Sequence, residues 1–389
     1  MTKTASHRMD AQDVFDTGIV QALALIKEHI LHDAVSHNEV DAILQTVEQE
    51  IKRQDIISFA RTCVHALRVQ LNLYGEQKLA PAWAQAYEHH PDAVFDALRC
   101  CFDETVANAL ARELPLDANA SATPTTRLWL RLGVARPAIS DSFAQSVAHL
   151  ASQLTDGLAI LCQWRCTGKA SPAQALAAIN AQTSQEEALQ CLVLMNSDRA
   201  LPAAQAIWAK HPCPSALAIL CTHAPTDMGT ALQDKRTTHI GQNLTCYAWA
   251  LLGDWAHTLA QAECIDWSDE QQCRALADSI ALVSGHTADY LFDISTSPAQ
   301  RKERLHTQAE TLALPTDQPL RLGTRRSAVT LGEAAPAVGA PLRHLLYIEH
   351  ACRLRAHTYI DASDLTAVQA LALMSASAWE RIAITEATR

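Results

Sequence analysis

The chain has 389 residues, more than one ordinary globular core needs and enough for two or three. Hydrophobic residues make up 49% and charged residues 19% of it, which excludes wholesale disorder, and 12 Gly and 15 Pro exclude a collagen-like sequence. The net charge of −11 disfavours nucleic acid as the main partner unless a local basic face exists. Only 5% of the residues are aromatic, and the Ala- and Leu-rich remainder favours helices over sheets.

The first 115 residues predict an N-terminal helical bundle, because apolar residues recur at three- and four-residue steps. Five helices are expected there, over residues 19–30, 40–51, 56–73, 81–88 and 93–114. Five antiparallel helices of this length can bury a core of their own. Residues 116–126 lack any period and collect turn formers, so they are interpreted as a linker.

Residues 127–297 predict a body of helical repeats. Four apolar helices end at Asn196, His223, Gly253 and Gly285, about 27, 30 and 32 residues apart. A shorter amphipathic helix is expected before each of them, over Pro172–Ile179, Leu201–Lys210, Met228–Gln233 and Ala256–Glu263. One such helical hairpin cannot bury its own apolar face, so stacking into an α-solenoid of HEAT-like hairpins is favoured. An irregular helical bundle remains the alternative.

Residues 298–389 do not follow the spacing of about 30 residues. They predict the last repeats and a C-terminal cap, which complete an all-α fold. A polar helix starts at Pro298 and ends by Leu314-Pro315, and Thr316–Thr324 is expected to be a loop. Helices are then expected over Ala328–Val338, interrupted at Pro336, over Pro341–Ala356, and around Ala367–Met374. The last of these would supply the polar outer face that stacked repeats require.

Signatures of catalysis are missing from the sequence. There is no Gly-x-Ser-x-Gly elbow and no Gly-x-Gly-x-x-Gly turn, and Thr167–Ser171 resembles only the end of a phosphate loop. His29 and His32 lie three residues apart and could supply two metal ligands, but solvated or packed side chains explain them more simply. The sequence therefore predicts a protein that is not an enzyme and has no metal or cofactor.

Twelve cysteines occur in the chain without an N-terminal apolar signal core. Cys63, Cys191, Cys246 and Cys273 all lie among apolar residues, as small buried hydrophobes do. We therefore expect reduced thiols and a cytoplasmic protein. The longest apolar runs are too short to cross a bilayer, so no membrane partner is expected.

The charge is uneven along the chain. Residues 1–123 carry 10 basic and 18 acidic side chains, residues 124–297 carry 10 and 15, and residues 298–389 carry 11 and 9. The basic excess of the last region comes from arginine, which favours a docking surface for an acidic partner, although a solvated basic face is the simpler alternative. The candidate contacts are Arg321, Arg325, Arg326, Arg343, Arg353 and Arg355, with Trp255 and Trp267 as weaker apolar anchors.

Acidic residues around Trp267 form a second cluster, which consists of Asp266, Asp269 and Glu270. These carboxylates could bind a cation. Ser268-Asp269-Glu270 is nevertheless more typical of a helix N-terminus with acidic residues in its first turn.

Several segments resemble a bacterial family of HEAT-like-repeat proteins without assigned activity, whose genes tend to lie near type VI secretion genes. They are Ala248–Asp254, Cys273–Gly285, Pro319–Thr330, Leu342–His350 and Ala367–Gln369. The similar region covers residues 190–373, about half of the chain. The resemblance implies a cytoplasmic, non-enzymatic accessory protein, and it offers no catalytic residue to transfer.

We interpret the sequence as a protein–protein interaction module, an adaptor, chaperone or immunity-type partner of a secretion system. Two alternatives stay open. A helical-repeat nucleic-acid-binding protein would use the C-terminal arginines on phosphates. A metal-dependent enzyme would use the histidines of the N-terminal helices. The oligomeric state is left open.

Overall fold

The computed structural model describes residue 95 and residues 123–135, 139–233, 241–288, 291, 296–312, 314–315, 318–354 and 359–360. The predicted bundle therefore lies outside the described residues apart from Phe95, and so does the terminal helix around 367–374. The chain divides into two compact units, with a boundary between Cys191 and Leu192. Within the described residues there are fourteen α-helices and one two-stranded hairpin, so the all-α prediction is confirmed for this part of the chain.

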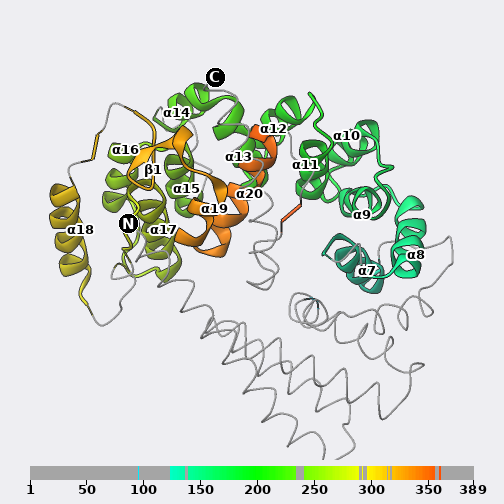
Figure 1. The fold of residues 1–389 in the computed structure, drawn as a ribbon, viewed down its shortest axis with the longest axis horizontal. Helices are drawn as coiled ribbons and strands as arrows, with labels where there is room; N and C mark the ends of the chain where they lie inside the picture. Colours follow the sequence, from blue (N-terminus) through cyan, green and yellow to red (C-terminus); the bar gives the residue numbers. More distant parts are fainter. Residues whose placement is uncertain are drawn as a thin grey trace, which may run out of the picture. The chain divides into compact units, whose positions relative to one another are not determined.

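The first unit contains four described helices before the boundary (Figure 1). They are α7 (Pro124–Ala135), α8 (Asp141–Ser152), α9 (Gly157–Thr167) and α10 (Pro172–Ala181). Helix α9 packs against α7, α8 and α10. Ser140, Asp156 and Ser171 cap the starts of α8, α9 and α10 by accepting backbone N–H bonds.

The structure of this unit bears on two expectations from the sequence, the linker before α7 and the phosphate-loop resemblance between α9 and α10. Helix α7 begins at Pro124, so the last residues of the predicted linker are helical. Gly168 ends α9 with a left-handed cap, and Ser171 forms a capping box with Gln174 at the start of α10. Thr167–Ser171 is therefore a turn between two helices and not a phosphate loop.

The helical pairs predicted for the repeat body are all present. They are α10 with α11 (Gln185–Leu194), α12 (Ala200–Trp208) with α13 (Pro214–His223), α14 (Pro225–Gln233) with α15 (Gln242–Leu252), and α16 (Trp255–Ala260) with α17 (Glu270–Ser284). A 3-10 turn, η2 (Gln261–Glu263), extends α16. The unit boundary falls within α11.

In the second unit the more apolar helix of each pair packs on the next one. Helix α13 packs on α15, and α15 packs on α17 (Figure 1). Helix α12 packs on its own partner α13. Helix α14 contacts α13 and α15, and α16 contacts α15 and α17. The core consists of fully buried side chains such as Leu217 in α13, Leu251 in α15 and Leu276 in α17. Asp269 caps α17 by accepting the N–H groups of Gln271 and Gln272. The acidic cluster around Trp267 thus contains a helix N-terminus, as the sequence favoured.

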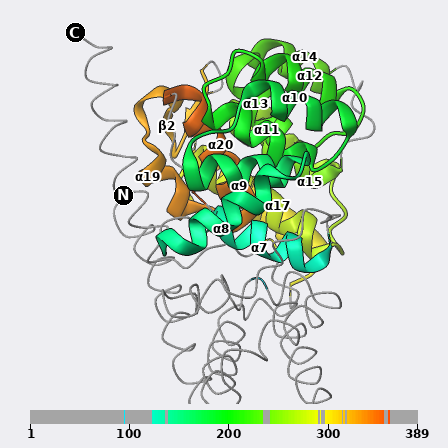
Figure 2. The ribbon, with the colours of Figure 1, turned by 90° about the vertical axis from the view of Figure 1, so that its right-hand side faces the viewer.

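The second unit also contains the elements that follow α17 in the chain. They are α18 (Pro298–Leu312), β1 (Leu320–Arg321), β2 (Thr324–Arg325), η4 (Arg326–Ala328), α19 (Leu331–Ala334), η5 (Ala335–Ala337) and α20 (Ala340–Leu354). Of these, β1, η5 and α20 pack on α17. Helix α20 packs on α13, α17 and α19, and Figure 2 shows α19, β2 and α20 gathered together. The expected helix over Ala328–Val338 is broken into shorter turns around Pro336.

The hairpin replaces the loop that the sequence predicted over Thr316–Thr324. Leu320 pairs with Arg325 and Arg321 with Thr324, which leaves Leu322 and Gly323 as a two-residue turn. Both turn residues have positive φ, 51° and 73°, as a type I′ hairpin turn requires. Strands of two residues are too short to produce an alternating pattern, so nothing in the sequence distinguished them from a loop.

None of the helices in the described part of the chain is long and apolar enough to cross a membrane.

Candidate functional site

The hairpin of β1 and β2 docks on the C-terminal ends of α15 and α17. The amide of Leu320 donates to the carbonyl of Gly253 at 2.8 Å, and the amides of Leu322 and Gly323 donate to Leu282 and Val283 at 2.7 and 2.8 Å. The last carbonyls of a helix have no partner within the helix. The hairpin backbone supplies these partners, so it is fixed on the helix ends.

Two glycines make this close approach possible. Gly253 and Gly285 end α15 and α17 in the left-handed conformation, both with φ of 76°. A Cβ on Gly253 would lie 2.6 Å from the carbonyl oxygen of Leu320, and one on Gly285 would lie 3.0 Å from that of Leu322. Any side chain at these positions would therefore strain the helix cap and push against the hairpin backbone.

A buried carboxylate, that of Glu349 on α20, joins the hairpin to α20. Arg321 donates to both of its oxygens at 3.0 and 2.9 Å, a bidentate pair in which both side chains are almost fully buried. Arg326 donates to Oε1 at 2.9 Å from a partly buried position. Arg353, one helical turn further along α20, is 3.6 Å away. One carboxylate thus serves three guanidinium groups.

The electrostatics of this site follow from burial and from the three cations. Burial by itself raises the pKa of Glu349, but the charges of Arg321, Arg326 and Arg353 outweigh it and hold the pKa at about 2. Burial lowers the pKa of Arg321, and the Glu349 carboxylate opposes this effect. Glu349 is therefore ionised at neutral pH.

The arginines singled out in the sequence differ widely in exposure. Arg325 is exposed on β2, and Arg326 and Arg353 are partly exposed beside Glu349. Arg321 and Arg343 are buried, and Arg343 donates to the carbonyls of Ala335 and Val338 at 3.2 and 2.8 Å. Arg355 lies outside the described residues.

The tryptophan anchors are also held by the chain itself. Trp255 is buried at the start of α16. Trp267 donates its indole N–H to the carbonyl of Ala262 at 3.1 Å, and the guanidinium of Arg301 lies over its ring at 5.6 Å. The sequence predicts that every candidate residue is available to a partner, and the burial of some of them corrects this prediction. Arg321, Arg343 and Trp255 are buried within the chain itself and are therefore not available as direct contacts.

Two buried ionic side chains were not singled out from the sequence. Glu349 is the only acid between Arg343 and Arg353, and its four-residue spacing from Arg353 was the available signal. Arg301 of α18 is 5% exposed and donates to the carbonyls of Leu291 and Trp267 at 2.6 and 2.7 Å. The charged face of α18 gave no sign that this arginine points inward.

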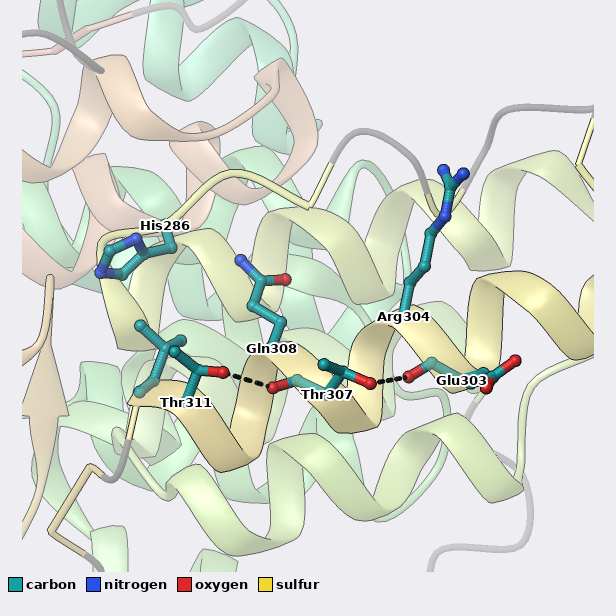
Figure 3. A pocket seen from close by; sticks show the side chains of 7 residues that line it. His286, Glu303, Arg304, Thr307, Gln308 and Thr311 are labelled. Carbon is teal, nitrogen blue, oxygen red and sulfur yellow. Dashed lines mark hydrogen bonds between the residues drawn. The ribbon is translucent and has the colours of Figure 1, made fainter.

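A groove of about 610 Å³ runs along α18 (Figure 3). It is lined by His286, Glu303, Arg304, Thr307, Gln308, Thr311 and Leu312. The hydroxyls of Thr307 and Thr311 donate to the carbonyls of Glu303 and Thr307 in the same helix, at 3.0 and 2.8 Å. These hydroxyl protons are therefore used within α18.

Among the described residues, no group of three or more His, Cys, Asp or Glu side chains could hold a metal ion. His29 and His32, which carry the metal-enzyme alternative, lie outside the described residues.

No protein-family model, curated protein or solved structure matches the chain. The resemblance to HEAT-like-repeat proteins therefore stays an expectation from the sequence.

Proposed function

We propose that the protein is a non-enzymatic interaction module that binds another protein through the basic edge of its C-terminal hairpin. The observation that carries the proposal is the position of Arg325. Its side chain is exposed on β2, next to Arg326, on a hairpin whose backbone is hydrogen-bonded to the ends of α15 and α17. An arginine on a rigid support loses little conformational freedom when it pairs with a carboxylate.

The local charge supports an acidic partner. Arg321, Arg326 and Arg353 carry three positive charges around the single carboxylate of Glu349, and Arg325 adds a fourth on the same hairpin, on a chain whose net charge is −11. This local excess of positive charge attracts acidic surfaces and raises the association rate. The repulsion between the whole chain and phosphate backbones favours a protein over a nucleic acid.

The arrangement of the repeats in this proposal is an α-solenoid. The series of contacts from α12 through α13 and α15 to α17 supports it, because each helical hairpin buries its apolar face on the next. A role as adaptor, chaperone or immunity-type accessory of a type VI secretion system, and a cytoplasmic location, rest on the resemblance alone.

The test begins with tagged full-length protein used to recover binding proteins from the native host. Chemical cross-linking and mass spectrometry then identify any stoichiometric partner whose cross-links reach the hairpin. We expect Arg325→Glu to weaken the complex at least tenfold. Arg304→Glu is the matched control, because it makes the same charge change on the exposed side of α18 and should leave the affinity unchanged.

Two outcomes contradict the proposal. Equal affinities for the two variants would remove the hairpin from the interface. Tight binding of an unrelated RNA or DNA duplex, with an affinity that falls steeply as salt rises, would favour the nucleic-acid alternative.

A further inference from the structure

Two cysteine thiols lie together on one face of α9. Cys162 is fully buried and Cys166, one helical turn later, is partly exposed. Both sulfurs pack on Gly133 of α7, at 2.6 and 3.6 Å from the position that a Cβ would take there. The sulfurs are therefore at most about 6 Å apart. The absence of a side chain at Gly133 leaves the space that they occupy.

The two thiols have opposite pKa shifts. Cys166 donates to the carbonyl of Gly133 at 3.6 Å. The hydrogen bond from Cys162 lowers the pKa of Cys166, against the effect of burial, and the charge of Arg165 lowers it further. By contrast, burial and the interaction with Cys166 raise the pKa of Cys162 well above its ordinary value, and burial raises the pKa of Cys191, Cys221 and Cys246 to about 12.

Arg165 supplies a fixed positive charge beside the pair. Its Nε donates to the carbonyl of Val134 at 3.1 Å, which holds the guanidinium at the end of α7. Its charge acts on both thiols in the direction that favours the thiolate.

The helical spacing fits a bridging ion better than a disulfide. Residues four apart on a helix have Cβ atoms about 5–6 Å apart, whereas a disulfide needs about 3.5–4.5 Å. With the zinc–thiolate bond length of about 2.3 Å as a guide, a linear sulfur–metal–sulfur unit needs sulfurs about 4.6 Å apart, which is below the upper limit of about 6 Å that their distances from Gly133 set. An ion can therefore bridge the two sulfurs without breaking the helix.

We propose that Cys162 and Cys166 form a two-thiolate site for a soft monovalent cation, with Cu(I) as the ion of best fit. Thiolates select soft ions such as Cu(I). Binding forms two sulfur–copper bonds and releases two protons to solvent. The product carries one negative charge, which the guanidinium of Arg165 offsets. The ion can reach the site from solvent through Cys166, which is partly exposed.

The experiment measures the transfer of Cu(I) from a chromogenic chelator to reduced full-length protein without oxygen. The chain has other free thiols to which Cu(I) can also bind, so the test compares the copper uptake of variants with that of the wild type. We expect wild-type protein to take up one more equivalent than the variant Cys162→Ser/Cys166→Ser, and Cys166→Ser to bind that equivalent at least tenfold more weakly. Arg165→Gln should reduce its affinity severalfold.

Cys264→Ser is the matched control, because Cys264 is an exposed thiol of the second unit. It should retain the tight equivalent. Circular dichroism checks that each variant is folded, and Cys166→Ala repeats the measurement without a new hydroxyl. Copper X-ray absorption should show two sulfur neighbours. Equal copper uptake by wild type and folded Cys166→Ser would overturn the proposal, and so would an equal loss in Cys264→Ser.

Discussion

At the scale of single residues, the position of Glu349 decides which arginines can face a partner. A buried guanidinium without an anion is costly, so the buried Arg321 depends on the carboxylate with which it forms two hydrogen bonds. Arg326 shares that carboxylate from a more exposed position, and Arg325 next to it points to solvent. The three neighbouring arginines therefore have three different roles.

We expect Glu349→Gln to destabilise the second unit by about 3–5 kcal/mol at neutral pH. The substitution keeps the shape of the side chain but leaves Arg321 buried without a negative partner. Urea unfolding followed by circular dichroism measures the loss. Glu310→Gln, an exposed change on α18, is the control and should shift the unfolding free energy by less than about 0.5 kcal/mol.

The same pair predicts a dependence on pH. The pKa of Glu349 is about 2 in the folded chain, below its ordinary value of 4.5, so the unfolded state takes up the proton first as the pH falls. The ionised Glu349 contributes about 3 kcal/mol to the free energy of unfolding. This contribution is complete above about pH 4.5 and is lost as the pH falls to about 2. The difference between wild type and Glu349→Gln should shrink over this range. A constant difference would contradict the assignment.

At the scale of elements, local patterns predicted the helices and missed the contacts that fix the hairpin. Helix α15, for example, follows from its apolar spacing and from the Gly253 stop, which lie within a few residues of each other. The hairpin instead depends on helix-end carbonyls such as that of Leu282, 40 residues before its partner Leu322 in the sequence. Similarly, only the fold brings Arg321 to Glu349, 28 residues away. Composition predicted an arginine-rich surface but could not distinguish the buried Arg321 and Arg343 from the exposed Arg325.

The glycine caps give a test at this scale. Gly253→Ala places a Cβ in a left-handed cap and 2.6 Å from the backbone of the hairpin, so we expect a loss of roughly 2–5 kcal/mol. Gly168→Ala is the matched control, because Gly168 has a φ of 69° and nothing within 4 Å of the added carbon. It should cost only the backbone strain, about 1–2 kcal/mol. Equal losses in urea unfolding would show that the hairpin does not press on Gly253.

At the scale of the whole molecule, the chain forms two compact units that each have a core. Leu128, Phe143 and Leu161 are almost fully buried in the first, and Leu217 and Leu276 in the second. The two proposed sites lie in different units, the thiol pair in the first and the basic hairpin in the second. Each site is therefore supported by the packing of its own unit, and a substitution in one unit acts first on the site that this unit contains.

Hydrogen exchange followed by mass spectrometry tests this division. Gly253→Ala should accelerate exchange in α15, α17 and α20, about tenfold for each 1.4 kcal/mol of lost stability, because their most protected amides open with the second unit. Protection of α8 and α9 should stay unchanged. Gly168→Ala should produce the reverse pattern, because its cap ends α9. Faster exchange in both units after either substitution would mean that the units unfold together. A defect at one site would then carry over to the other.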